Sequence, residues 1–171
     1  MSSIAWRQCA FVTSVSASRQ LLSLGICCVA LMLIVGCNSK EQQTIDPRDL
    51  ENIKLGEVVH LSGMLKKPAE AVCALTDYEA RLDEKESLSR QVNAYLTATK
   101  FTLDEGHWAL VFVNGDKIDV QTFRRSKLAF VARHEGVPRN FRPVDCTSVP
   151  RALVTKVKYI FAPALILGEE R

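Results

Sequence analysis

The sequence predicts an α+β domain, with an antiparallel sheet of about four to six strands and one main amphipathic helix. Three features support this class. Apolar residues recur at helical spacing from residue 88 to residue 96, a turn-forming Asn114-Gly115 pair separates two strand-like segments, and residues 153–161 alternate as in a half-buried strand. A helix and a sheet with one apolar side each bury those sides against one another, which favours packed layers.

The first 36 residues are typical of a secretory signal peptide. They contain no acidic residue, their only charges are Arg7 and Arg19, and residues 21–35 are mostly apolar. A basic start followed by a short apolar run is the pattern of a cleaved signal. A membrane-spanning helix needs about 20 apolar residues, and polar residues interrupt this run on both sides. We therefore favour a signal peptide over a retained membrane span.

The apolar run ends in Leu33-Ile34-Val35-Gly36-Cys37, which resembles the lipobox of bacterial lipoprotein precursors. The resemblance implies cleavage before Cys37 and acylation of that cysteine, with palmitate or a similar chain, and so a lipid anchor in the bacterial cell envelope. Asn38 after the cysteine implies the outer membrane, facing the periplasm. Cys27 and Cys28 fit less well, because neither follows a small residue. The alternative for Cys37 is a secretory cysteine that pairs in a disulfide.

Residues 38–49 are polar and have too little apolar content to bury themselves, which is typical of a tether. The expected organisation is a signal peptide over residues 1–36, a lipidated cysteine and flexible tether over 37–52, and a single domain over 53–171. Removal of the signal takes away two of the 22 basic residues and none of the 19 acids. The remaining chain is nearly neutral, which argues against nucleic acid as a partner.

The strand-like segments before the helix are residues 55–65, which contain Gly56 and Gly63, and the apolar run of residues 71–75. The second run fits a buried strand or the edge of a helix, and we favour the strand. The helix is expected to begin near Asp83, because Glu86 three residues later completes a capping pair. Glu86 and Arg90 have the spacing of an ion pair on one helix face. Its apolar stripe consists of Leu88, Val92, Tyr95 and Leu96.

A β-hairpin is predicted next, with residues 107–113 and 117–123 as its strands and Asn114-Gly115 as its turn. We expect Trp108 to lie in the core. Residues 127–132 are expected to extend the hairpin into a meander. Residues 133–150 contain several prolines among polar residues and predict a long loop, and Pro163 is expected to end the following strand or to mark a sheet edge.

Two cysteines, Cys73 and Cys146, remain if the signal is removed and Cys37 is lipidated. An even pair in a small exported domain predicts a disulfide. In the chain-entropy account, a bond closing a loop of about 70 residues contributes roughly 4 kcal/mol. Two separate buried thiols are the alternative. The spacing excludes a Cys-x-x-Cys zinc or redox motif.

No motif of an enzyme is present, so we predict no catalytic residue, no metal site and no cofactor. His60, His107 and His134 are scattered and lack the spacing of metal ligands on a helix. Asp104 and Glu105 precede His107 and have the chemistry of acid and base groups. Such a cluster is far more often a solvated turn.

The long loop is the better candidate for a working surface, because it carries Arg139, Phe141 and Arg142, and arginine and aromatic side chains are common interface anchors. Arg124 and Arg125 are expected to add a basic patch beside it. A solvated loop held down by Cys146 is the alternative. The favoured function is a non-catalytic module that binds a protein partner in the envelope, as an assembly accessory or as an inhibitor or immunity protein. The alternative function is a small envelope hydrolase that uses a histidine and carboxylates.

Overall fold

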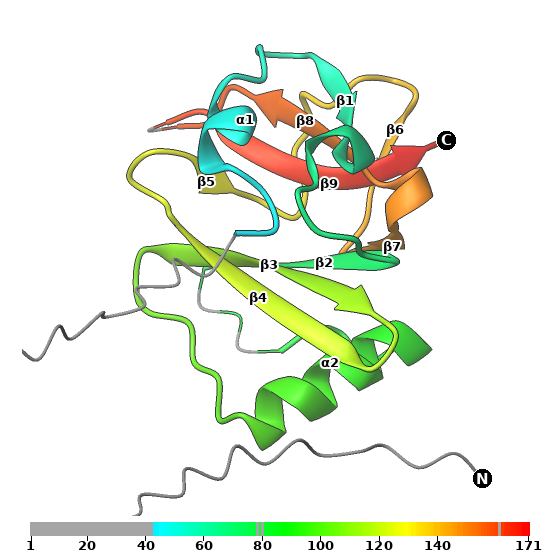
Figure 1. Ribbon diagram of the computed structural model, residues 1–171. Helices are drawn as coiled ribbons and strands as arrows, with labels where there is room; N and C mark the ends of the chain where they lie inside the picture. Colours follow the sequence, from blue (N-terminus) through cyan, green and yellow to red (C-terminus); the bar gives the residue numbers. More distant parts are fainter. Residues whose placement is uncertain (1–42, 78, 80, 161) are drawn as a thin grey trace, which may run out of the picture. The chain divides into compact units, whose positions relative to one another are not determined.

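The computed structural model describes residues 43–77, 79, 81–160 and 162–171, which form three layers (Figure 1). Two sheets pack face to face, and helix α2 (Ser87–Ala98) covers the outer face of the second sheet. The predicted α+β class with one main helix is therefore confirmed, with two sheets instead of one. The predicted signal peptide and Cys37 lie outside the described residues. Within the described part, no helix is long and apolar enough to cross a membrane.

The first sheet is built around the C-terminal strand β9 (Ala164–Glu170), which was not predicted from the sequence. One edge of β9 pairs with β8 (Leu153–Val157), which in turn pairs with the short β1 (Val58–His60). Its other edge pairs with β5 (Ala129–Phe130) in parallel and with β6 (Phe141–Pro143) in antiparallel orientation. The predicted strand over residues 55–65 is thus mostly wrong, because a 3₁₀ helix, η1 (Leu61–Met64), follows β1 directly.

The second sheet has the order β4-β3-β2-β7 and contains the predicted hairpin. Its strands are β2 (Ala71–Leu75), β3 (His107–Asn114), β4 (Lys117–Arg124) and β7 (Cys146–Ser148). Asn114 pairs with Lys117, so the turn is Gly115-Asp116, one residue later than predicted. Gly115 has φ 57°, a left-handed conformation that glycine adopts without steric cost.

Separate apolar clusters fill the two spaces between layers. Trp108 is fully buried between the sheets, as predicted, where its ring stacks on Phe123 with centroids 4.3 Å apart. Its indole Nε1 donates a hydrogen bond to the carbonyl oxygen of Leu128 at 2.6 Å. On the other face of the second sheet, the predicted stripe of α2 packs against β3. The burial of Val92 and Leu96 confirms the helical spacing.

The start of α2 differs from the predicted capping pair. Glu86 occupies the N-cap position but makes no side-chain hydrogen bond to the helix, and Asp83 instead pairs with Lys85 at 2.6 Å. The Arg90 side chain donates to the carbonyl oxygen of Glu84 at 3.5 Å, in place of the expected pair with Glu86. The amphipathic stripe, rather than the cap, fixes the position of this helix.

Two predictions for the second half of the chain are wrong. Residues 127–132 do not extend the hairpin, because β5 crosses to the first sheet and lies parallel to β9. Residues 133–150 are not one loop, since they contain β6 and β7. Both strands are only 3 residues long, too short to show a clear alternation in sequence.

The domain begins earlier than predicted. We call residues 44–51, which end in the short helix α1 (Pro47–Glu51), the N-terminal strap. Ile45 and Leu50 of the strap are 0 % exposed and belong to the core between the sheets. The prediction of a flexible tether as far as residue 52 is therefore corrected. The few apolar residues of this segment are the ones that it buries.

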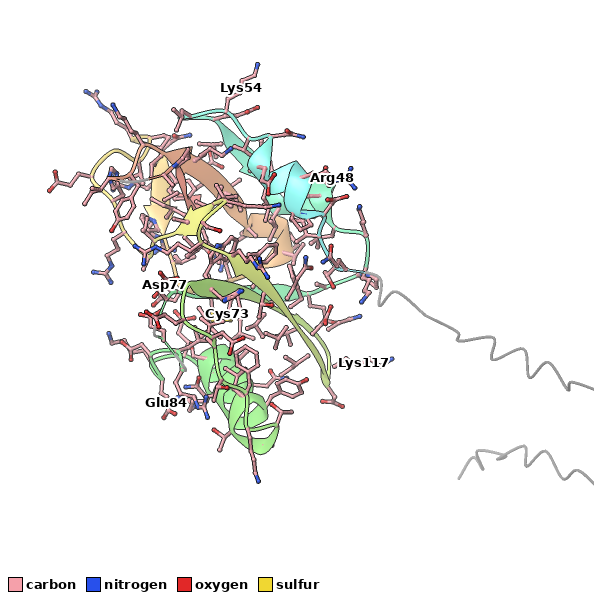
Figure 2. The ribbon with its side chains drawn as sticks, turned by 90° about the vertical axis from the view of Figure 1, so that its left-hand side faces the viewer. Arg48, Lys54, Cys73, Asp77, Glu84 and Lys117 are labelled. Atoms are coloured by element: carbon pink, nitrogen blue, oxygen red, sulfur yellow. A yellow bond between two sulfur atoms is a disulfide. The ribbon has the colours of Figure 1, made fainter. Side chains whose placement is uncertain are left out.

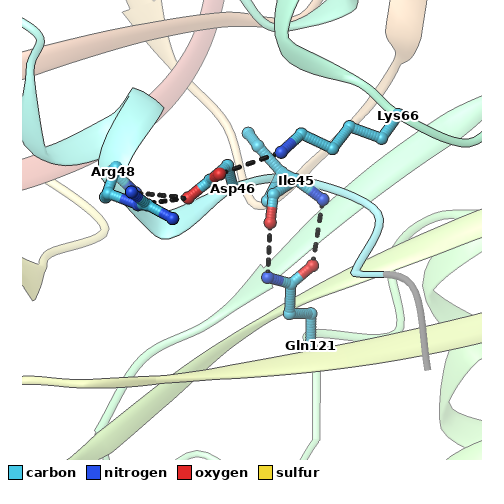
Figure 3. A network of polar contacts seen from close by, with 5 residues as sticks. All are labelled: Ile45, Asp46, Arg48, Lys66 and Gln121. Atoms are coloured by element: carbon cyan, nitrogen blue, oxygen red, sulfur yellow. Dashed lines mark hydrogen bonds and ion pairs between the residues drawn. The ribbon is translucent and has the colours of Figure 1, made fainter. Parts of the chain in front are cut away.

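The strap is held by polar contacts to β4 as well as by its buried side chains (Figure 3). The backbone N–H of Ile45 donates to Gln121 Oε1 at 3.1 Å, and Gln121 Nε2 donates to the Ile45 carbonyl at 2.7 Å. Lys66 Nζ lies 2.9 Å from the Asp46 carboxylate. Gln121 is a polar side chain that is buried because the strap covers it.

Cys73 and Cys146 form the predicted disulfide. The two residues are directly opposite each other on β2 and β7, at the edge of the second sheet. Figure 2 shows Cys73 in this sheet, above α2. The bond links the short edge strand β7 to its neighbour β2 in the interior of the sheet.

Candidate functional site

The candidate site is a cleft of about 640 Å³ at the end of the second sheet where β3 begins and β4 ends. One side is formed by the turn after β4, and the other by the loop between β8 and β9. We refer to it as the cleft. Its lining residues are Gly106, His107, Arg124, Arg125, Ser126, Ala129, Tyr159 and Ala162.

Backbone hydrogen bonds fix both sides of the cleft. The N–H of Arg125 donates to the carbonyl oxygen of Gly106 at 2.8 Å and so extends the hairpin pairing by one step. The N–H of Ala129 donates to the carbonyl oxygen of Pro163 at 3.2 Å and ties the turn after β4 to the end of the β8–β9 loop. Binding groups held by regular elements keep a defined geometry.

The charged side chains of the cleft are basic. Arg125 forms an ion pair with Asp77 at 2.5 Å, and Asp77 follows β2 in the second sheet (Figure 2). Arg124 is exposed, and within the described part of the chain no carboxylate pairs with it. The lining itself contains no acidic residue. The cleft therefore presents one compensated and one uncompensated guanidinium group.

An exposed apolar side chain belongs to the loop that forms one side of the cleft. Ile160 is 77 % exposed and sits in the β8–β9 loop between Tyr159 and Ala162, which both line the cleft. Leu55, near β1, is the other large apolar residue that is exposed in the described chain, at 58 %. A large exposed apolar residue next to arginine and tyrosine is the composition of an interface hot spot.

The structure separates the five residues predicted for binding. Arg124 and Arg125 meet in the cleft, at the Ala164 end of β9. Phe141 is 0 % exposed, so its prediction as a surface anchor is wrong, because its ring fills the core on the outer side of the first sheet. Arg142 pairs with Glu169 at the opposite end of β9, and Arg139 is exposed in the turn before β6.

Tyr159 and Ile160 are functional candidates that sequence reasoning missed. They were assigned to a half-buried strand running to residue 161, but β8 ends at Val157 and all of its residues are buried. The available signal was Pro163, which removes a backbone donor and favours a strand end shortly before it. The exposed Ile160 then follows as part of a loop.

The described hydrogen bonds of the histidines are with backbone groups. His107 Nδ1 lies 3.2 Å from the backbone carbonyl oxygen of Glu105, and His134 Nδ1 accepts a hydrogen bond from the N–H of Gly136 at 2.9 Å. His60 is exposed. Among residues 43–77, 79, 81–160 and 162–171, no carboxylate is hydrogen bonded to a histidine, and no group of three His, Cys, Asp or Glu side chains is arranged to hold a metal ion.

Two buried charged groups outside the cleft have structural partners. Burial lowers the pKa of Lys156, whose Nζ donates to the carbonyl oxygen of Glu51 at the end of the strap. Glu169 is buried between Arg142 at 2.6 Å and Arg151 at 2.9 Å and also accepts a hydrogen bond from Thr147. These contacts join elements of the fold and leave the cleft as the candidate site.

Comparison with known proteins yields no match among protein-family models, curated proteins or solved structures.

Proposed function

We propose that this chain is a non-catalytic protein-binding module of the bacterial envelope, anchored to a membrane through a lipid on Cys37. Its partner would be a protein that it helps to assemble or that it inhibits. The observation that carries this proposal is the exposed Ile160, which follows Tyr159 in the loop that forms one side of the basic cleft. An exposed apolar side chain is stabilised when a partner covers it and removes its surface from water.

The position of the strap supports work close to the membrane. The folded domain begins at Thr44, so six residues, 38–43, separate it from Cys37. A segment of that length reaches at most about 25 Å even when it is fully extended. A lipid on Cys37 would therefore hold the module beside the headgroups, within reach of partners at the same membrane.

The hydrolase alternative gains no support from the described residues. It requires a histidine within hydrogen-bond reach of a carboxylate, in a pocket open to substrate. His107 does line the cleft, but its Nδ1 lies against the backbone carbonyl oxygen of Glu105. The binding function requires only the exposed apolar and basic groups that the cleft presents.

Recovery of a partner from detergent-solubilised envelopes tests the binding function. The tagged full chain should recover a stoichiometric protein, and Ile160→Asp should abolish that recovery. Leu55→Asp is the matched control, because Leu55 is also a large exposed apolar residue but lies away from the cleft. Equal recovery by all three chains would exclude the cleft as the binding site.

Lipid labelling tests the anchor separately. Cys37→Ser should stop the incorporation of labelled palmitate and release the chain from the membrane fraction, while Cys28→Ser should leave both unchanged. Continued labelling of the Cys37→Ser chain would refute the assignment of the anchor to this cysteine.

A further inference from the structure

We propose that the cleft binds an acidic segment of the partner, with a carboxylate against Arg124 and Arg125 and a neighbouring apolar side chain against Tyr159 and Ile160. This inference rests on the proposed function, because it names the chemistry of the partner that the same cleft would hold. It follows from the charges of the lining, from the apolar groups beside them, and from the exposure of Ile160 outside the cleft.

The charge of the lining selects an anion. The described residues that line the cleft include two guanidinium groups and no carboxylate, so its local charge is positive. Arginine presents a planar set of donors that matches the two oxygens of a carboxylate. The cleft is therefore complementary to an aspartate or glutamate side chain, or to a chain terminus.

Arg124 is the stronger of the two contacts. Asp77 takes up part of the charge of Arg125, and it holds that side chain in place with one oxygen while its Oδ1 has no hydrogen-bond partner in the described structure. Arg124 also borders a smaller adjoining cavity of about 170 Å³, whose lining includes one basic and one acidic residue, Lys127 and Glu51. That lining adds no net charge of its own beyond Arg124, so the attraction for an anion centres on Arg124.

A small anion alone would leave the apolar groups at the cleft exposed to water. Tyr159 is half-buried and its ring meets that of His134 edge-on, with centroids 6.1 Å apart, which leaves a fixed aromatic surface in the cleft. Ala129 and Ala162 add apolar surface beside it. A free phosphate or acetate would leave Ile160 in water, whereas a protein segment that continues past the cleft would cover it. A volume within the range of about 300–1,000 Å³ typical of ligand sites accommodates several side chains.

Fluorescence anisotropy with a defined probe tests this inference on the full chain in detergent micelles. The probe is a fluorescein-labelled peptide in which aspartate alternates with leucine, and it should bind saturably. Replacement of its aspartates by asparagine, or of its leucines by serine, should each weaken binding by about tenfold, the effect of losing one charged pair or one apolar anchor.

Variants of the chain then assign the binding to the cleft. Arg124→Gln and Ile160→Ser should each weaken binding of the aspartate-leucine peptide by about tenfold. Lys54→Gln and Leu55→Ser are the matched controls, since both side chains are exposed, and Lys54 lies far from Asp77 in Figure 2. Their affinities should equal that of the unchanged protein. The substituted side chains are all exposed, so the thermal unfolding of the four variants should match as well.

Three results would overturn the inference. The first is the absence of saturable binding by the aspartate-leucine peptide, and the second is equal binding of the aspartate and asparagine peptides. The third is displacement of the peptide by inorganic phosphate together with no effect of Ile160→Ser, which would identify a small-anion site. If an envelope partner depends on Ile160 while the peptide does not bind, the inference fails and the proposed function stands.

Discussion

The contact between Phe141 and Gly168 decides how β6 joins the first sheet. A Cβ atom at position 168 would lie 2.4 Å from two carbon atoms of the Phe141 ring and 2.6 Å from the carbonyl oxygen of Arg142. Those separations are far below van der Waals contact, so no side chain fits there unless β6 moves. Glycine is required at this position by the close approach of two strands.

Gly168→Ala should therefore destabilise the domain by about 1–3 kcal/mol, the usual cost of overpacking a filled core. Urea unfolding followed by circular dichroism measures the loss. Gly63→Ala is the control, because no atom lies within 4 Å of a Cβ built at that position. An equally large loss in both variants would contradict the assignment to the Phe141 contact.

Glu169 is a buried carboxylate whose partners outweigh its desolvation. Burial raises the pKa of Glu169. This effect is outweighed by the hydrogen bonds from Thr147 and Arg142 and by the charges of Arg142 and Arg151, which lower the pKa. The pKa of Glu169 therefore lies below the ordinary glutamate value. Such a group contributes stability that is present above the unfolded-state pKa and is lost as the pH falls through the lower folded-state pKa.

Glu169→Gln should reduce the free energy of unfolding by about 1.5–3 kcal/mol at neutral pH, the contribution of hydrogen bonds to a charged group. The difference from the unchanged protein should shrink as the pH falls below about 4.3, the usual glutamate pKa, because the carboxylate of the unchanged protein is then progressively protonated. Urea unfolding at a series of pH values measures this. The control is Glu170→Gln, at the exposed end of β9, which should show neither effect. A loss of stability in Glu169→Gln that does not change with pH would argue against the charge as its cause.

At the scale of elements, the N-terminal strap is joined to β4 by hydrogen bonds between its backbone and a side chain of β4. Both the N–H and the carbonyl of Ile45 bond to the amide of Gln121, and the same residue forms a bridge with Leu65. Since the strap is the first part of the folded domain after Cys37, any pull exerted through a lipid anchor would act on these contacts first.

Gln121→Ala should loosen the strap while the rest of the domain stays folded. We expect faster hydrogen exchange at residues 44–51 and a loss of about 1–3 kcal/mol of stability, because two buried backbone groups of Ile45 lose their partner. Hydrogen exchange followed by mass spectrometry resolves the two regions. Thr122→Ala, at an exposed position of the same strand, should leave the exchange of the strap unchanged, and similar exchange in both variants would contradict this role of Gln121.

Elements with a strong local pattern could be predicted from the sequence, and elements defined by distant partners could not. The α2 stripe and the hairpin are set by residues close together in the chain, and the disulfide by the count of cysteines. β5 and β6 exist because β9 provides an edge for them, so their short sequences carry no signal of their own. Two residues of the cleft, Arg124 and Arg125, were predicted to lie at the surface. The exposure of Ile160 was not predicted, because β8 ends at Val157 and not at residue 161.

At the scale of the whole molecule, the three layers carry both the cleft and the strap. Trp108 packs against Phe123 of β4 and Phe130 of β5, so the turn after β4 is fixed to the core between the sheets. One side of the cleft is therefore anchored in the core. In the proposed function, the lipid holds the chain at the membrane and the cleft binds the partner.

A photo-crosslinking residue placed at position 160 of the full chain, in living cells, tests the central claim most directly. The account predicts that irradiation joins the chain to one dominant envelope protein, that Arg124→Gln in the same chain reduces this product, and that the same group at position 55 gives none of it. Equal products from positions 160 and 55, or no protein product at position 160, would contradict the claim that this cleft binds a protein partner.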